Sequence, residues 1–199
     1  MAALLPLLVA DWTLPWSEHV LCTDASESGF GAVHSQWSLP DVKTAGRVLE
    51  RARFRRRPGH SARDAFFEAA GLSRGTDGLW GPSEGQAVRE DWEVDPNFPE
   101  LKPDIFEQCR WATLLSGPWR FHDEPVVVLE ARALVLGFQA LVSKLGLTRC
   151  RALCIVDNMS TCLAFDRRRS RNRKILKCIR RLSAWSLLRG PGLRPVGAF

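Results

Sequence analysis

Two apolar segments of this chain each end on an acidic residue, and this pattern restricts the fold more than any other feature. The first segment, residues 20–24, ends on Asp24 and is followed by a Ser-Gly turn and a second apolar run, residues 30–37. The other, residues 152–157, is almost continuously apolar and ends on Asp157. Both of the segments that end on an acid predict strands. The strand over residues 152–157 is expected to be central in a sheet and covered on both faces. Each acid then lies at the carboxyl end of a strand, where a charge needs compensation.

A third acid, Glu130, belongs to a helical pattern over residues 129–145. The residues three, four, seven, eight and eleven positions after it are small or apolar, which places Glu130 in the first turn of a core-facing stripe. A strand around residues 110–115 is expected before this helix. After Asp157 we expect a helix capped by Asn158 or Ser160, a further helix over residues 172–188 and a short strand over residues 193–199.

The pattern is lost between residues 38 and 108, where proline, glycine, arginine and acidic residues dominate. This stretch is interpreted as a long insertion between the second and third strands, with short helices and with disorder in the basic run 51–57. The expected organisation is an N-terminal extension, 1–18, and one principal domain, 19–199. That domain is interrupted by 38–108 and is expected to be truncated at its C-terminus.

The charge and residue composition of the chain favour some classes of partner and site and exclude others. The net charge of +6 and the isoelectric point near 9.3 favour a polyanionic partner. Six cysteines without CxxC spacing and four scattered histidines disfavour a zinc site and favour a reduced intracellular compartment, cytoplasmic or nuclear. The apolar start lacks a basic flank and is too short for a bilayer, and no other segment is expected to cross a membrane. The chain has no tyrosine, which excludes a tyrosine-recombinase nucleophile.

The three acids have a shared interpretation and separate ones. Ligands collect beyond the carboxyl ends of parallel strands, so Asp24, Glu130 and Asp157 are expected to converge on hard cations, Mg²⁺ or Mn²⁺. Two ions within such a group could support phosphodiester hydrolysis. Separately, Asp24 could cap the Ser-Gly turn, Glu130 could stabilise a helix N-terminus, and Asp157 could begin the next helix. A separation of more than roughly 10 Å among the three would exclude shared ions.

Three sequence blocks, 24–32, 129–134 and 156–160, resemble the successive active-site blocks of ribonuclease H domains in retrotransposon reverse transcriptases, most closely the DIRS-like group. The resemblance covers about 19–37 and 109–199. It implies an α/β fold of the ribonuclease H-like class, a mixed sheet of about five strands, three antiparallel first and then parallel, with flanking helices. It also implies that Asp24, Glu130 and Asp157 bind two Mg²⁺ ions and cleave the RNA strand of an RNA/DNA hybrid. Retroviral-type integrases usually order these acids Asp, Asp, Glu, so the order here favours ribonuclease H.

Two features depart from that family: the long separation between Asp24 and Glu130, and the lack of a match to its fourth acidic or histidine position. The only acid after Asp157 is Asp166, which is expected to be a solvated charge on a helix surface. Three hypotheses therefore stay open: an active nuclease, a catalytically inactive nucleic-acid-binding remnant, and a protein-interaction module on the same fold. Other domains of a reverse transcriptase polyprotein are the expected protein partners. The residues expected to contact nucleic acid lie near Asp24 or after Asp157. They are Ser26, Asn158, Ser160, Arg167, Arg168, Arg169, Arg171, Arg173 and Lys174.

Overall fold

The computed structural model describes residues 13–56, 66–67, 70, 72–74, 80–82, 92–101, 104–107, 109–120, 123–190 and 192–197. The chain divides into two compact units, residues 1–50 with 99–199 and residues 51–98. Residues 1–12 of the expected N-terminal extension, together with Arg57 and residues 198–199, lie outside the described part. The first unit carries all three predicted acids.

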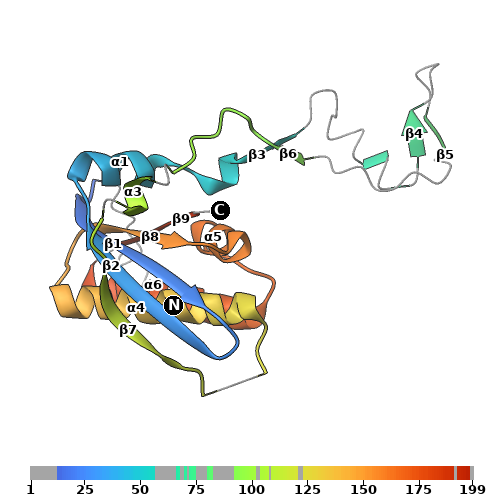
Figure 1. The fold of residues 1–199 in the computed structure, drawn as a ribbon. Coiled ribbons are helices and arrows are strands. Elements are labelled where there is room, and N and C mark those ends of the chain that lie inside the picture. Colours follow the sequence, from blue (N-terminus) through green and yellow to red (C-terminus); the bar gives the residue numbers. More distant parts are fainter. Residues whose placement is uncertain are drawn as a thin grey trace, which may run out of the picture. The chain divides into compact units, whose positions relative to one another are not determined.

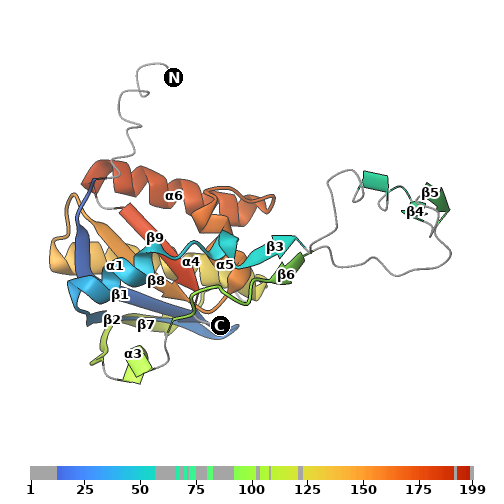
Figure 2. The same ribbon diagram turned by 90° about the horizontal axis from the view of Figure 1, so that it is seen from above.

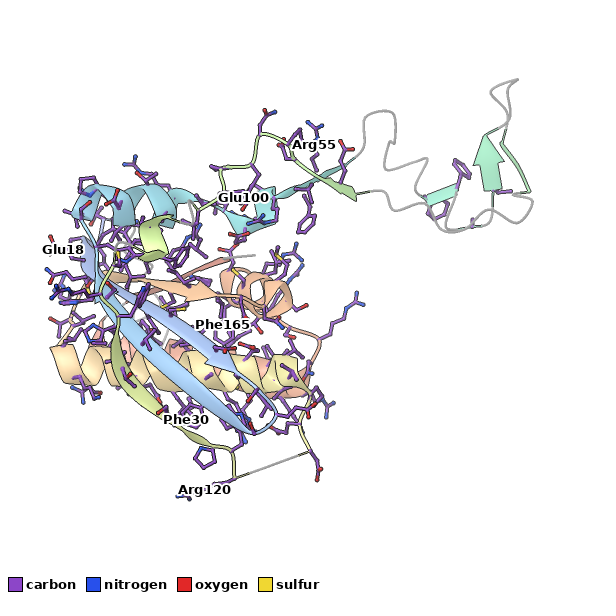
Figure 3. The ribbon with its side chains drawn as sticks, viewed as in Figure 1. Glu18, Phe30, Arg55, Glu100, Arg120 and Phe165 are labelled. Carbon is purple, nitrogen blue, oxygen red and sulfur yellow. The ribbon has the colours of Figure 1, made fainter. Side chains whose placement is uncertain are left out.

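Five strands of the first unit form one mixed sheet, in the order β7-β2-β1-β8-β9 (Figure 1). Strand β1 pairs antiparallel with β2 and parallel with β8, β2 pairs antiparallel with β7, and β8 pairs parallel with β9. The predicted number and directions of the strands are therefore confirmed, and the molecule is a mixed α/β protein. The strands are β1 (Trp16–Ala25), β2 (Gly29–Gln36), β7 (Ala112–Pro118), β8 (Arg151–Val156) and β9 (Gly192–Gly197). Glu18 and Phe30, labelled in Figure 3, mark the two ends of the β1–β2 hairpin.

Helices cover the sheet on both faces (Figures 1 and 2). Alternate residues of β8 belong to two different clusters: Cys154 and Val156 pack with α4, whereas Leu153 and Ile155 pack with α1. The prediction that this strand is covered on both faces is confirmed. The helices of the first unit are α1 (Leu39–Arg47), α3 (Asp104–Glu107), α4 (Val126–Leu145), α5 (Met159–Asp166) and α6 (Arg173–Arg189). The 3-10 turn η2 (Glu50–Ala52) leads into the second unit.

Helix α4 packs closely against the sheet at Gly137. A Cβ atom there would lie 2.8 Å from Thr23 Cγ2 and 3.0 Å from Ala32 Cβ, so only glycine allows this packing distance. Contrary to expectation, one helix among the described residues, α4, is long and apolar enough to cross a membrane by length and composition alone. Core helices of soluble proteins pass the same test, and most of α4 is buried in this fold.

Strand β9 fixes the neighbouring helices through Arg194. Its guanidinium donates to the carbonyls of Gly46 and Val48, at the end of α1, and binds Asp166 of α5 at 2.7 Å. The solvated charge expected for Asp166 is therefore wrong: its side chain is only 5% exposed and is compensated by Arg194. Helix α1 lies in the stretch interpreted as an insertion, yet it forms part of the first unit and covers its sheet.

The second unit contains two short antiparallel strand pairs. One pairs β3 (Phe54–Arg56) with β6 (Trp92–Val94), and the other pairs β4 (Leu72–Arg74) with β5 (Trp80–Pro82). The disorder expected for the basic run 51–57 is wrong for Phe54–Arg56, because these residues form strand β3. Arg55 binds Glu93 at 2.9 Å across the pair, and the guanidinium of Arg53 lies 4.3 Å from the ring centre of Phe98.

Candidate metal centre

The register of the two central strands brings the two aspartates together. Thr23 of β1 is paired with Val156 of β8, so Asp24 and Asp157, the next residues, lie side by side at the carboxyl edge of the sheet. Both side chains belong to exposed residues. The partner of Asp24 on the other side is Gly31, which presents no side chain to the site. Parallel pairing has thus placed two residues that are remote in sequence within one strand spacing.

Glu130 reaches this edge from α4. The helix begins at Val126 after Pro125, three residues earlier than predicted, so Glu130 lies in the second turn rather than the first. Glu130 is 3% exposed, which confirms that it lies on the core-facing side of the helix. Two turns later Gly137 holds the helix against β1 and β2. The hydroxyl of Thr161, in α5, donates to the Val127 carbonyl at 3.4 Å, and this contact joins the start of α5 to the start of α4.

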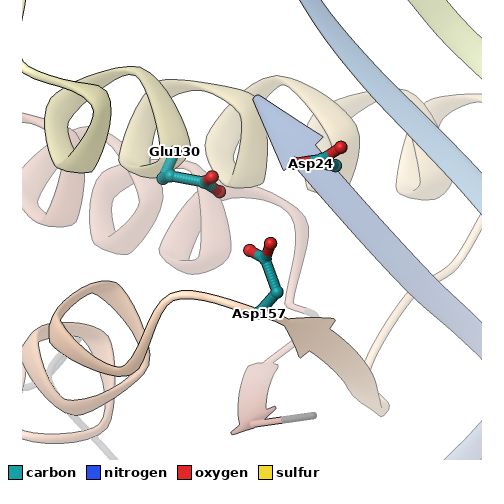
Figure 4. A group of neighbouring side chains, drawn as sticks. All are labelled: Asp24, Glu130 and Asp157. Carbon is teal, nitrogen blue, oxygen red and sulfur yellow. The ribbon is translucent and has the colours of Figure 1, made fainter. Parts of the chain in front are cut away.

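The carboxylates of Asp24, Glu130 and Asp157 converge. One oxygen from each lies within 4.8 Å of the others, and Asp157 projects from the end of β8 toward Glu130 (Figure 4). This separation is well below the roughly 10 Å beyond which the three acids could not share ions. These three groups could hold a metal ion.

The raised pKa values at the site are those expected for a cluster of acids whose negative charges have no positive partner. Burial, followed by the charges of Asp157 and Asp24, raises the pKa of Glu130 to about 7, although a hydrogen bond with the backbone of Ala25 acts against the shift. Burial and Asp24 also raise the pKa of Asp157. The Cys22 thiol has its pKa raised to about 11, first by burial and then by the three acids. Cys22 is therefore a protonated, half-buried thiol.

The hydrogen bonds at this edge do not support the separate structural interpretations of the aspartates. The β1–β2 turn is closed by Ser26, whose amide donates to the Gly29 carbonyl at 2.9 Å and whose hydroxyl accepts from the Gly29 amide at 3.2 Å. Helix α5 is capped by Asn158, whose side chain accepts from the Thr161 amide at 3.0 Å. Neither turn nor cap uses the side chain of Asp24 or Asp157 among the hydrogen bonds of the described residues. Ser26 and Asn158 themselves have structural roles.

The predicted nucleic-acid-binding residues differ in how free they are to contact a ligand. Ser160 and the arginines of the α5–α6 connection are exposed. Lys174 is 55% exposed, but its ammonium binds Glu124 at 3.0 Å. The exposed arginines are Arg167, Arg168, Arg169, Arg171 and Arg173.

Glu124 is a residue that the sequence pattern did not identify. It binds Arg132 of α4 at 2.6 Å and Lys174 of α6 at 3.0 Å, and so connects the starts of these two helices. These partners lower its pKa, with the Arg132 hydrogen bond as the largest cause. No helical spacing relates Glu124, Arg132 and Lys174, because Glu124 precedes α4 and Lys174 lies on another helix. The sequence therefore contained no signal for this network.

The donor set suits a hard divalent cation. Three carboxylates offer only oxygen, the ligand that Mg²⁺ and Mn²⁺ prefer. Glu130 Oε2 is buried and has no hydrogen-bond partner among the described residues, so one donor atom is already free of competing contacts. Opposite ligands of one Mg²⁺ lie about 4.2 Å apart, and paired ions lie about 3.5–4 Å apart. A group of oxygens within 4.8 Å is compatible with either arrangement.

Comparison with known proteins adds no family to this picture. Neither the protein-family models nor the curated proteins nor the solved structures include a match to this chain. The assignment of the site therefore depends on its residues and on their geometry.

Proposed function

We propose that the first unit is a ribonuclease H-like nuclease domain of retroelement origin that hydrolyses the RNA strand of RNA/DNA hybrids. The observation that carries the proposal is the convergence of Asp24, Glu130 and Asp157 at the carboxyl edge of the sheet. The number of strands in the sheet and their directions are also what the sequence resemblance implied.

The three carboxylates would hold two Mg²⁺ or Mn²⁺ ions, which supply the charge that activates water and stabilises the leaving oxygen in phosphodiester hydrolysis. Each residue contributes from a different element. Asp24 and Asp157 are fixed by strand register, and Glu130 is fixed by the packing of α4 at Gly137. Because three rigid elements supply the oxygens, little reorganisation is needed when the cation binds.

The exposed arginines between α5 and α6 would bind the phosphates of the substrate. They follow the same strand that carries Asp157, and Lys174 is joined to Glu124, only a short distance along the chain from Glu130. Contacts of this kind are independent of sequence and weaken as salt increases. This matches a substrate that is recognised as a hybrid rather than by its bases.

The decisive experiment is cleavage of a labelled RNA/DNA hybrid by the purified chain with Mg²⁺, with Mn²⁺ and with a chelator. We expect cleavage of the RNA strand with either ion. Asp24→Asn should reduce the rate by at least about 10²-fold, the scale seen when a group that stabilises transition-state charge is removed. The matched control is Glu27→Gln, because Glu27 is an exposed acid in the neighbouring turn.

Other outcomes select the other hypotheses. Hybrid binding without cleavage under both ions would indicate a nucleic-acid-binding remnant. Absence of binding at any salt concentration would indicate a protein-interaction module. Equal cleavage by the wild type and Asp24→Asn would show that the activity arises elsewhere, and the proposal would then be wrong.

A further inference from the structure

A pocket separate from the three acids lies between β2, the end of β7, α4 and α6. Its volume is about 530 Å³, which is in the range of small-molecule sites. Leu129 lines this pocket whereas its neighbour Glu130 does not, because adjacent residues of a helix point in different directions. Phe30 and Arg120, labelled in Figure 3, lie at the same end of the sheet and both line the pocket.

One wall of the pocket is aromatic and apolar. The rings of Phe30 and Trp119 have centroids 4.4 Å apart and are tilted by 34°. The indole N–H of Trp119 donates to the Ser26 carbonyl at 2.9 Å, so its polar atom is already satisfied and the ring offers an apolar face. Leu129 and Leu136 extend this surface along α4. Such a wall favours a planar or apolar ligand body.

The rim of the pocket is positively charged. Three arginines, Arg120, Arg132 and Arg181, line it against a single acid, Glu124. That acid is already bound by Arg132 and, from outside the pocket, by Lys174. Arg120 and Arg181 are exposed and have no carboxylate partner among the residues that the structure describes; Arg181 makes only a 3.4 Å contact with Gln139. Their guanidinium groups remain available for an anionic ligand.

We propose that this pocket binds an amphipathic organic anion, with an aromatic or apolar body against Phe30 and Trp119 and an anionic head held by Arg120 and Arg181. The geometry supports this ligand class because the apolar wall and the excess of arginine belong to one cavity. The inference does not depend on the nuclease proposal, since none of the three acids lines the pocket.

The test uses anilinonaphthalene sulfonate as the probe and N-phenylnaphthylamine, which lacks the sulfonate, as its uncharged analogue. Fluorescence titration of the full chain should show one saturable sulfonate site with much weaker binding of the analogue. Arg181→Gln should weaken sulfonate binding by about 3- to 10-fold, the scale of a partly exposed charge-assisted hydrogen bond. The matched control, Arg180→Gln, changes the same charge on the neighbouring residue, which does not line the pocket.

Two further variants keep the test independent of folding. Leu136→Trp should fill the pocket and remove binding of both probes, and Arg120→Gln should repeat the effect of Arg181→Gln, since both arginines line the pocket. Near-ultraviolet circular dichroism verifies that each variant is folded, because partly folded chains also bind this dye. Equal affinity for the two probes, or equal weakening by Arg181→Gln and Arg180→Gln, would overturn the proposal.

Discussion

Glu124 and Glu130 are six residues apart and both lie near the start of α4, yet their surroundings shift their pKa values in opposite directions. Glu124 is bound by Arg132 and Lys174, and its pKa is lowered. Glu130 is buried beside two aspartates, and its pKa is raised to about 7. The first acid is compensated by the chain itself, whereas the second has no protein cation close by in the described site. The comparison shows where a cation from solution would have most to contribute.

The largest difference between the two glutamates is expected in divalent-ion binding. Glu130→Gln should weaken Mn²⁺ binding by at least about 100-fold, because even the loss of a partner outside the ligand shell costs about 10- to 100-fold. Glu124→Gln should change the affinity little. Calorimetric titration with Mn²⁺ at pH 8 measures both. Equal losses in the two variants would show that Glu130 is not the cation ligand.

Stability should respond to the same substitutions with opposite signs in the metal-free protein. Glu130 has an ordinary pKa of 4.5 and a folded-state pKa of about 7, so its ionised form destabilises the native state. The free energy of unfolding therefore falls as pH rises from about 4.5 to about 7. Glu130→Gln should remove this loss and be more stable than the wild type by about 2–3 kcal/mol at pH 8, with no difference near pH 4. Urea unfolding in chelator measures it.

Glu124→Gln is the counterpart in this measurement. Because its pKa is lowered in the folded state, ionised Glu124 contributes stability above its ordinary pKa, and this contribution is lost as pH falls through the lowered pKa. The variant should be less stable than the wild type by about 1 kcal/mol at pH 8, a value reduced for the partial exposure of Arg132 and Lys174. Stabilisation by Glu124→Gln at that pH would contradict the comparison.

A comparable effect on stability is expected at Gly137, where α4, the helix that carries Glu130, packs against the sheet. Alanine normally stabilises a helix by about 1 kcal/mol relative to glycine. Here Gly137→Ala should instead destabilise the protein by about 1–3 kcal/mol, because the added Cβ would lie 2.8 Å from Thr23 Cγ2. It should also weaken Mn²⁺ binding, while Ser143→Ala, at an exposed position on the same helix, should do neither. Stabilisation by both substitutions would show that this close approach is not required.

The smallest expected effect separates Lys174 from its neighbour Arg173. Arg173 is exposed, whereas the ammonium of Lys174 is bound to Glu124. Arg173→Gln should lower the slope of log affinity for an RNA/DNA hybrid against log salt by about 1, the value for one lost phosphate contact. Lys174→Gln should lower it less. Fluorescence anisotropy at several salt concentrations measures the slopes, with Arg189→Gln, at the far end of α6, as control.

Much of this site was predictable because its residues lie where local patterns end. The apolar run before Asp157 defined β8, and the side chain of Asn158 caps the next helix as predicted. The start of α4 was predicted less well, since residues 126–128 are three valines, which favour strands. The helix nevertheless begins at Val126, directly after Pro125, and buries Val128 in the core.

Ion pairs and packing contacts between residues far apart in the sequence could not be predicted from the sequence pattern. Asp166 is buried because Arg194, 28 residues later, compensates it, and nothing near Asp166 in sequence indicates that partner. The same holds for Glu124 and Lys174. Helix α1 lies in a stretch whose composition resembles an insertion, yet its residues Val42 and Ala45 complete the cluster on the second face of the sheet. Such placements are set by tertiary packing, which periodicity alone does not encode.

The pairing of β1 with β8 has a consequence for the order of folding. The β1–β2 hairpin joins residues close in the chain, whereas Thr23 meets Val156 only after a very long loop is closed. Contacts of such large sequence separation form slowly, so we expect the hairpin to form before β8 pairs with β1. The two aspartates meet only through that pairing. A divalent ion should therefore stabilise the paired sheet and not the isolated hairpin.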